Sequence, residues 1–140
     1  MEQSLILVKP DGVERGLVGE VISRIEKKGL RLAALKMVRI DEALARVHYR
    51  DHVAKPFFPD LLSFITRSPV VAMVVEGNDC VELMRALIGA TKHTEAAPGT
   101  IRGDYAYSFT ENLVHGSDSP ESARREIGIF FSPDEIFSQG

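Results

Sequence analysis

The sequence contains a single cysteine, Cys80, among 140 residues. One thiol excludes an intrachain disulfide and provides no zinc framework. Because Cys80 falls on the apolar face of a predicted helix, we expect its thiol to be packed in the core and not reactive. No apolar run approaches the ~20 residues of a membrane span, and the first residues lack the basic and apolar regions of a signal peptide. We therefore expect a cytoplasmic protein with no membrane partner.

A surplus of positive charge is also absent, since the formal net charge is −3. The protein therefore has no field that would attract nucleic acid non-specifically, and we do not expect nucleic acid as a partner. A polyanionic ligand would have to be held by a local cluster of cations. The remaining composition, 44% hydrophobic and 26% charged residues, is ordinary for a globular protein, and the length predicts one domain over residues 1–140.

Glycine-rich phosphate loops are missing too. The chain contains no GxxxxGK[ST] run, no GxGxxG loop and neither the HRD nor the DFG motif of protein kinases. If the protein binds phosphate, side chains must therefore supply the positive charge.

Apolar runs and helical periodicity predict alternating strands and helices. Strands are expected at 5–8, 30–40, 70–75 and about 112–115, and helices at 18–28, 41–50, 57–66, 80–88 and from 120 onward. Asn78 or Asp79 is expected to cap the fourth helix and Ser119 the last one. Residues 9–12 are predicted to form a turn and 90–110 a long loop, the kind of loop that is often functional.

This order contains two β-α-β units with buried strands. It predicts an α/β (α+β) fold, a ferredoxin-like sandwich in which helices cover one main face of a four-stranded antiparallel sheet.

Among the four histidines, His115 has the most unusual surroundings, because Gly116, Ser117 and Asp118 follow it directly. Glycine would let another molecule come close, and the short polar side chains could orient an imidazole or cap the next helix. This setting favours a histidine that acts as a base, a metal ligand or a nucleophile.

The other histidines have plainer surroundings. His48 and His52 have the i, i+4 spacing of a metal pair, but no third ligand is nearby and their neighbours indicate a solvated helix face. His93 is expected to be exposed in the long loop.

The segment Asn112-x-x-His115-Gly116-Ser117-Asp118 resembles the active-site motif of nucleoside diphosphate kinases at every fixed position. The resemblance extends over almost the whole chain, including residues 8–12, 99–104 and 121–123. The chain resembles the compact, prokaryotic-type members of this family. It implies that the γ-phosphate of a nucleoside triphosphate, chiefly ATP, passes to nucleoside diphosphates by a ping-pong mechanism through phosphohistidine on His115. It also implies broad base specificity, and Mg²⁺ that arrives with the nucleotide instead of being held by ligands of the chain.

The same resemblance implies a role for each matching residue. Arg85 and Arg102 would hold the β- and γ-phosphates with the Thr91 hydroxyl. Lys9 would reach the sugar and the transferring group, and Asn112 the ribose. The base would stack on Phe57, with Leu61 beneath and Phe109 on the other face, although a core position for Phe57 is the alternative. Supporting roles fall to Tyr49, Ser117 and Glu126, and Asp118 would either reach Mg²⁺ through water or cap a helix.

The chain departs from the family pattern at two places, where Lys92-His93 follow Thr91 and where Phe109 replaces a smaller aliphatic residue. Residues 98–104 resemble those of hexameric members more than tetrameric ones, so a homo-oligomer is expected and a hexamer is favoured over a tetramer.

Three other functions compete with this interpretation. A nucleotide-binding module without catalysis is disfavoured by the intact set at positions 9, 49, 85, 102, 112, 115 and 126. Nucleic-acid binding or cleavage is disfavoured by the absence of a basic stripe. A hydrolase that uses a metal on His48 and His52 would show chelator-sensitive activity and form no phosphoenzyme.

Overall fold

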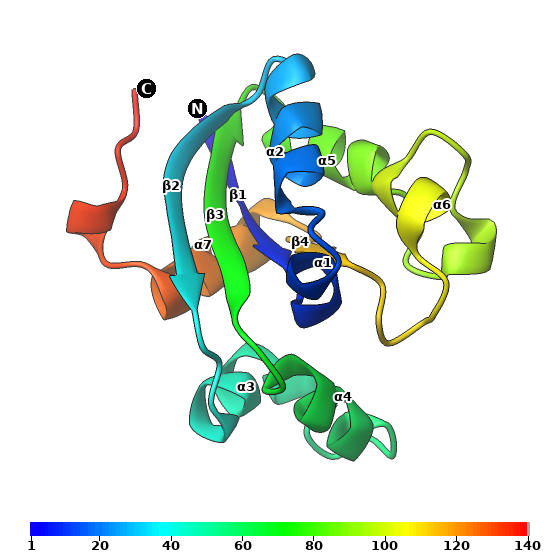
Figure 1. Cartoon of the computed structure of the whole chain (residues 1–140). Coiled ribbons are helices and arrows are strands. Elements are labelled where there is room, and N and C mark those ends of the chain that lie inside the picture. The colour runs from blue at the N-terminus through cyan, green and yellow to red at the C-terminus, as the bar shows by residue number, and fades with distance from the viewer. Residues whose placement is uncertain (140) are drawn as a thin grey trace.

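A computed structural model describes residues 1–139 and contains one four-stranded antiparallel sheet in that range (Figure 1). The strands are β1 (Glu2–Val8), β2 (Arg31–Val38), β3 (Val70–Gly77) and β4 (Val114–Gly116). Their order in the sheet is β2-β3-β1-β4, and all three neighbouring pairs are antiparallel. The predicted ferredoxin-like sandwich is therefore confirmed.

The two central strands, β1 and β3, are buried on both faces. Side chains alternate along a strand, so Leu5 and Leu7 of β1 enter one apolar core while Ile6 and Val8 enter another. This explains why both strands are continuous apolar runs.

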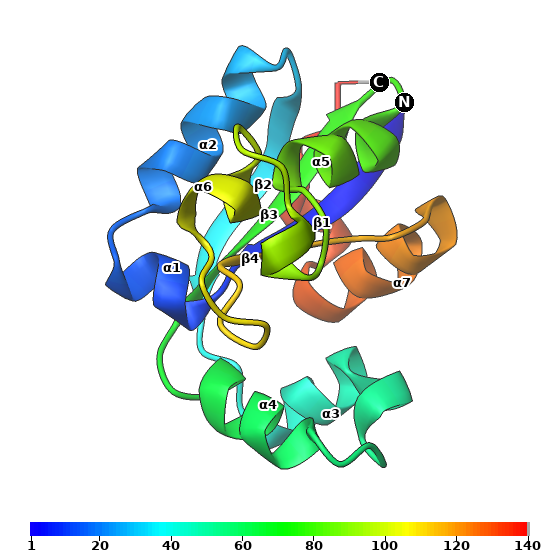
Figure 2. The same cartoon turned by 90° about the vertical axis from the view of Figure 1, so that its right-hand side faces the viewer.

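Helices cover both faces of the sheet (Figure 2). α2 (Val18–Lys27) and α5 (Cys80–Ile88) pack on one face, and α7 (Pro120–Phe130) packs on the other. α3 (Glu42–His48) lies beyond one end of the sheet and contacts α7 (Figure 1). The expectation of helices on one main face was wrong, because a strand that is apolar on both sides needs a covering layer on each. Ser119 caps α7 as predicted, its Oγ accepting from the Ser122 N–H at 3.0 Å. Asp79 stands before α5 in a left-handed conformation, and its side chain makes no capping bond.

Short helices replace the predicted turn and part of the predicted loop. α1 (Pro10–Glu14) begins where residues 9–12 were expected to form a turn, with proline at its first position. α6 (Ile101–Tyr105), capped by Thr100, lies within the expected loop 90–110. Helices of five residues are too short to show a periodic pattern. The rest of the helical structure comprises α4 (Phe58–Ile65) and the 3₁₀ turns η1 (Arg50–His52), η2 (His93–Glu95) and η3 (Pro133–Glu135).

Cys80 is fully buried, and its thiol donates to the Val75 carbonyl at 3.1 Å. Burial, together with the charges of Glu2 and Glu76, raises the pKa of this thiol to about 12. The prediction of a packed cysteine is confirmed. Within residues 1–139, none of the helices has the length and apolar character needed to cross a bilayer.

Candidate active site

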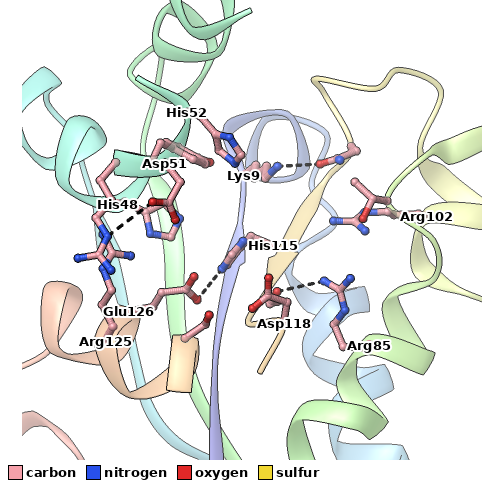
Figure 3. Close-up of a pocket in the computed structure, with 16 residues that line it drawn as sticks. Lys9, His48, Asp51, His52, Arg85, Arg102, His115, Asp118, Arg125 and Glu126 are labelled. Carbon is pink, nitrogen blue, oxygen red and sulfur yellow. Dashed lines mark hydrogen bonds and ion pairs between the residues drawn. The ribbon is translucent and has the colours of Figure 1, made fainter. Parts of the chain in front are cut away.

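His115 lies in the middle of β4, opposite Leu7 of β1, and its imidazole faces a pocket of about 340 Å³ (Figure 3). Side chains from the helices α3, α5, α6 and α7, from the turn η1, from the connecting segments and from β4 itself meet there. The pocket contains most of the residues singled out in the sequence, namely Lys9, Tyr49, Arg85, Thr91, Arg102, Asn112, His115, Asp118 and Glu126. Phe57 and Ser117 are not on its wall.

The position of Asn112 depends on a γ-turn at Leu113. Leu113 has a φ of +77°, and the Val114 N–H donates to the Asn112 carbonyl two residues back at 2.9 Å. The Leu113 N–H donates to Oδ2 of Asp11 at 3.1 Å, and its carbonyl accepts from the Lys9 N–H at 2.8 Å. These long-range bonds hold the strained turn in place. Burial raises the pKa of the Asp11 carboxyl above its usual value.

Gly116 packs closely against the core. A Cβ at this position would lie 2.6 Å from Cδ1 of Ile88 and 3.4 Å from Cδ1 of Ile6. The main reason for glycine next to the histidine is therefore the close approach of β4 to α5, although the sequence suggested access for another molecule. The Gly116 carbonyl also accepts from Nη1 of Arg85 at 3.4 Å.

One carboxylate orients the imidazole. Nε2 of His115 lies 2.9 Å from Oε1 of Glu126, and the Ser117 hydroxyl donates to the same oxygen at 2.8 Å. Burial works to raise the pKa of Glu126, but the bonds from His115 and Ser117 outweigh it and hold that pKa below its usual value. The ionised carboxylate can only accept, so Nε2 carries the proton and Nδ1 is left with a free lone pair.

Three cations gather around this imidazole. Burial and the neighbouring Arg102 lower the pKa of Lys9 to about 8, and burial and Arg85 lower the pKa of Arg102 to about 10. Within residues 1–139 none of Lys9, Arg85 and Arg102 forms an ion pair; their hydrogen bonds go to neutral oxygens, including Asn112 Oδ1 at 2.8 Å from Lys9 Nζ. Lys9 and Arg102 are buried and Arg85 is partly buried, and cations in such positions without a carboxylate partner favour a polyanionic ligand.

The aromatic residues that were expected to contact a base lie outside this wall. Phe57, just before α4, is 44% exposed and packs at 5.5 Å from the ring of His52, which does line the pocket. The prediction that Phe57 lies at the surface is therefore confirmed, and the alternative that it lies in the core is wrong. Leu61 is buried, whereas Phe109 is exposed on the segment after α6.

The prediction for His48 was wrong. This residue is only 6% exposed, and its ring meets the ring of His115 edge-on at 4.9 Å. The signal was present in the sequence, because Leu44, Ala45 and His48 lie on one face of α3 that packs toward α7. The structure also brings Arg125 into the pocket, which sequence reasoning missed. His93 is partly buried in η2 and not fully exposed.

The chain offers no metal cage in the part that the structure describes. No group of three or more His, Cys, Asp or Glu side chains is arranged to hold an ion within residues 1–139. His48 and His52 therefore lack the third ligand that a resident metal would need. Asp118 does not cap α7, because Ser119 does, and its carboxylate instead lines the pocket.

The fold and this pocket define an α/β protein with a cationic pocket built around one histidine. The sequence model for nucleoside diphosphate kinase matches residues 2–136. The chain belongs to the nucleoside diphosphate kinase family.

Relatives support this assignment over nearly the full length. The chain is 60% identical to the nucleoside diphosphate kinase of Methanosarcina barkeri over 136 residues, which cover 97% of this chain and 91% of the relative. It is 56% identical to that of Listeria innocua over 138 residues, or 99% and 94% of the two chains. The structure of a halophilic nucleoside diphosphate kinase from Halobacterium salinarum in complex with CDP superposes with a TM-score of 0.96, at 50% identity and with 99% and 93% coverage.

Proposed function

We propose that this protein transfers the γ-phosphate of nucleoside triphosphates, chiefly ATP, to nucleoside diphosphates by a ping-pong mechanism through phosphohistidine on His115. The observation that supports the proposal is the contact between Nε2 of His115 and Glu126, which leaves the Nδ1 lone pair available on a ring that shares its pocket with three cations. Family membership supports phosphotransfer between nucleotides as the reaction type.

In the first half-reaction, the Nδ1 lone pair attacks the γ-phosphorus. The bond from that phosphorus to the β,γ-bridging oxygen breaks, and the electron pair leaves with the nucleoside diphosphate. The ring acquires positive charge, which the Glu126 carboxylate balances while it continues to accept from Nε2–H. In the second half, a terminal oxygen of another nucleoside diphosphate attacks the same phosphorus and the imidazole leaves neutral.

The cations stabilise the charge that moves during both steps. Arg85 and Arg102, with the Thr91 hydroxyl, are assigned to the β- and γ-phosphates, and Lys9 to the sugar and the transferring group. Asn112 is assigned to the ribose. Phe57 offers an exposed ring face beside the pocket, and stacking on such a face tolerates every base. Glu126 is assigned to hold the His115 ring, and Ser117 and Tyr49 are assigned supporting roles around it.

Kinases of this family need a divalent cation, and we assign Mg²⁺ to that role. Mg²⁺ is usually held by substrate phosphates, waters and one or two carboxylates and not by a protein cage. The pocket fits this mode, because it contains the carboxylate of Asp118 but no three-ligand cluster within residues 1–139. Mg²⁺ would share the phosphate charge with the three cations.

We also propose that the protein forms a homo-oligomer, with a hexamer favoured over a tetramer. Its proposed location is the cytoplasm. β2 is an outer strand whose Leu35 and Met37 are 51% and 63% exposed, next to Val18 and Ile22 of α2. An apolar outer strand is a template for pairing with another chain. Light scattering of the purified protein would measure the mass; a monomer would contradict this part of the proposal.

The central test is labelling with γ-³²P-ATP and Mg²⁺. The wild-type protein and a His93→Ala control should become labelled, and each of several nucleoside diphosphates should discharge the label. His115→Ala should take up no label. Initial-velocity plots should give parallel lines, and intersecting lines or a labelled His115→Ala protein would refute the mechanism.

A further inference from the structure

His48, the last residue of α3, lies next to His115. Its ring contacts that of His115 at 4.9 Å between centroids with an interplanar angle of 81°. Two more aromatic rings contact the His48 ring, with centroid distances of 4.5 Å to Tyr49 and 5.3 Å to Phe130 of α7. In Figure 3 His48 stands on one side of His115, with Arg85 and Arg102 on the other.

The His48 imidazole behaves as a neutral ring. Neither of its nitrogens has a hydrogen-bond partner among residues 1–139. The ionisable groups whose charges act on the His48 ring are His115, Glu126, Lys9 and Arg125. Burial and the positive neighbours outweigh the carboxylate of Glu126 and lower the pKa of His48 to about 3. At neutral pH the side chain therefore contributes shape without adding a positive charge next to His115.

Among residues 1–139, one hydrogen bond fixes the orientation of the His115 ring, the bond from Nε2 to Glu126. Rotation about the Cβ–Cγ bond would move Nε2 away from that carboxylate and turn Nδ1 away from the cations. A perpendicular, tightly held ring at van der Waals distance opposes this rotation, because the edge of one ring rests on the face of the other.

We propose that His48 is a positioning residue for His115: its flat ring restricts rotation of the His115 imidazole, so that Nε2 stays on Glu126 and Nδ1 faces the phosphate site. The catalytic consequence rests on the proposed phosphotransfer function, whereas the orientation of the His115 ring does not. In this proposal the shape of the His48 side chain is its essential property. Phenylalanine at position 48 should therefore preserve the orientation of the His115 ring, whereas smaller or non-planar side chains should not.

The test compares His48→Ala, His48→Leu and His48→Phe in the full chain, with Val47→Ala on the exposed face of the same helix as control. Single-turnover labelling by γ-³²P-ATP should be about 10- to 100-fold slower in the Ala and Leu variants, since small misplacements of a reacting group are costly. Nucleotide dissociation constants should stay within about twofold of wild type. His48→Phe should label within about threefold of the wild-type rate.

A second readout does not need activity. ¹⁵N NMR of the His115 side chain without nucleotide should show one tautomer, Nε2–H, in wild type and His48→Phe, and averaged nitrogens in His48→Ala and His48→Leu. Wild-type labelling rates and tautomer in His48→Leu, or loss of both in His48→Phe, would overturn the role of His48. If wild type itself takes up no label, the proposed function fails, and the NMR comparison still decides whether His48 orients the ring.

Discussion

Oε1 of Glu126 lies 2.9 Å from Nε2 of His115, so a carboxylate on α7 holds Nε2 of the β4 imidazole and not Nδ1. Glu126→Gln would keep a hydrogen-bond acceptor but remove the negative charge that, in the proposed mechanism, would balance the phosphorylated ring. We expect kcat to fall by about 10²-fold with nucleotide affinity within about twofold of wild type, measured by steady-state and single-turnover kinetics. Glu121→Gln, an exposed position on the same helix, is the matched control. An unchanged kcat in Glu126→Gln would show that orientation alone matters.

The lowered pKa of Lys9, about 8, predicts an alkaline limit to nucleotide binding. Below that pH the ammonium is protonated and, by the proposed function, would bind phosphate. As the pH rises through this pKa, the free protein loses the charge and binding would require proton uptake. Affinity for the nucleoside triphosphate should therefore fall above pH 8, by up to about tenfold per pH unit. Titration calorimetry in buffers of different ionisation enthalpy measures both the affinity and the proton uptake.

Lys9→Arg is the control for this pH dependence, because arginine stays charged over the whole range. Its affinity is expected to be lower at neutral pH, owing to poorer fit, but flat from pH 7.5 to 9.5 within about twofold. A parallel alkaline decline in wild type and Lys9→Arg would assign the limit to another group.

The sequence was sufficient for the elements whose patterns are local. Apolar runs predicted β1 and β3, and i, i+3, i+4, i+7 spacing predicted α2 and α5, because burial of one strand or one helix face is written into consecutive residues. Motif resemblance brought together Lys9, Arg85 and Arg102, although they are far apart in the chain.

What failed depends on contacts between distant residues. Asp11 and Leu113 are 102 positions apart, and no local pattern predicts that one carboxylate holds the other residue in a left-handed turn. His48 was judged by its polar neighbours Tyr49 and Arg50, but the packing of α3 toward α7 decides its burial. The close approach of Gly116 to Ile88 is likewise a tertiary contact.

That contact predicts a specific rescue. Gly116→Ala places Cβ 2.6 Å from Cδ1 of Ile88 and should lower the free energy of unfolding by about 1–3 kcal/mol. Ile88→Val removes Cδ1, so the double variant should be more stable than Gly116→Ala despite the second truncation. Urea unfolding of the four proteins gives the coupling energy. Gly128→Ala on α7, where no atom lies within 4 Å of the new Cβ, is the control. Additive losses in the double variant would contradict a direct clash.

The γ-turn at Leu113 should reverse the usual order of alanine and glycine. Leu113 is fully buried with φ +77°, so Leu113→Ala and Leu113→Gly should each lose about 2–5 kcal/mol of unfolding free energy through lost packing. Alanine keeps the backbone strain, whereas glycine adopts a positive φ without cost. Leu113→Gly should therefore be the more stable of the two by about 1 kcal/mol in urea unfolding. At Leu83, in the middle of α5, the same pair should show the opposite order by about 1 kcal/mol. Equal or lower stability of Leu113→Gly relative to Leu113→Ala would mean that the bonds from Asp11 and Lys9 do not hold a strained turn.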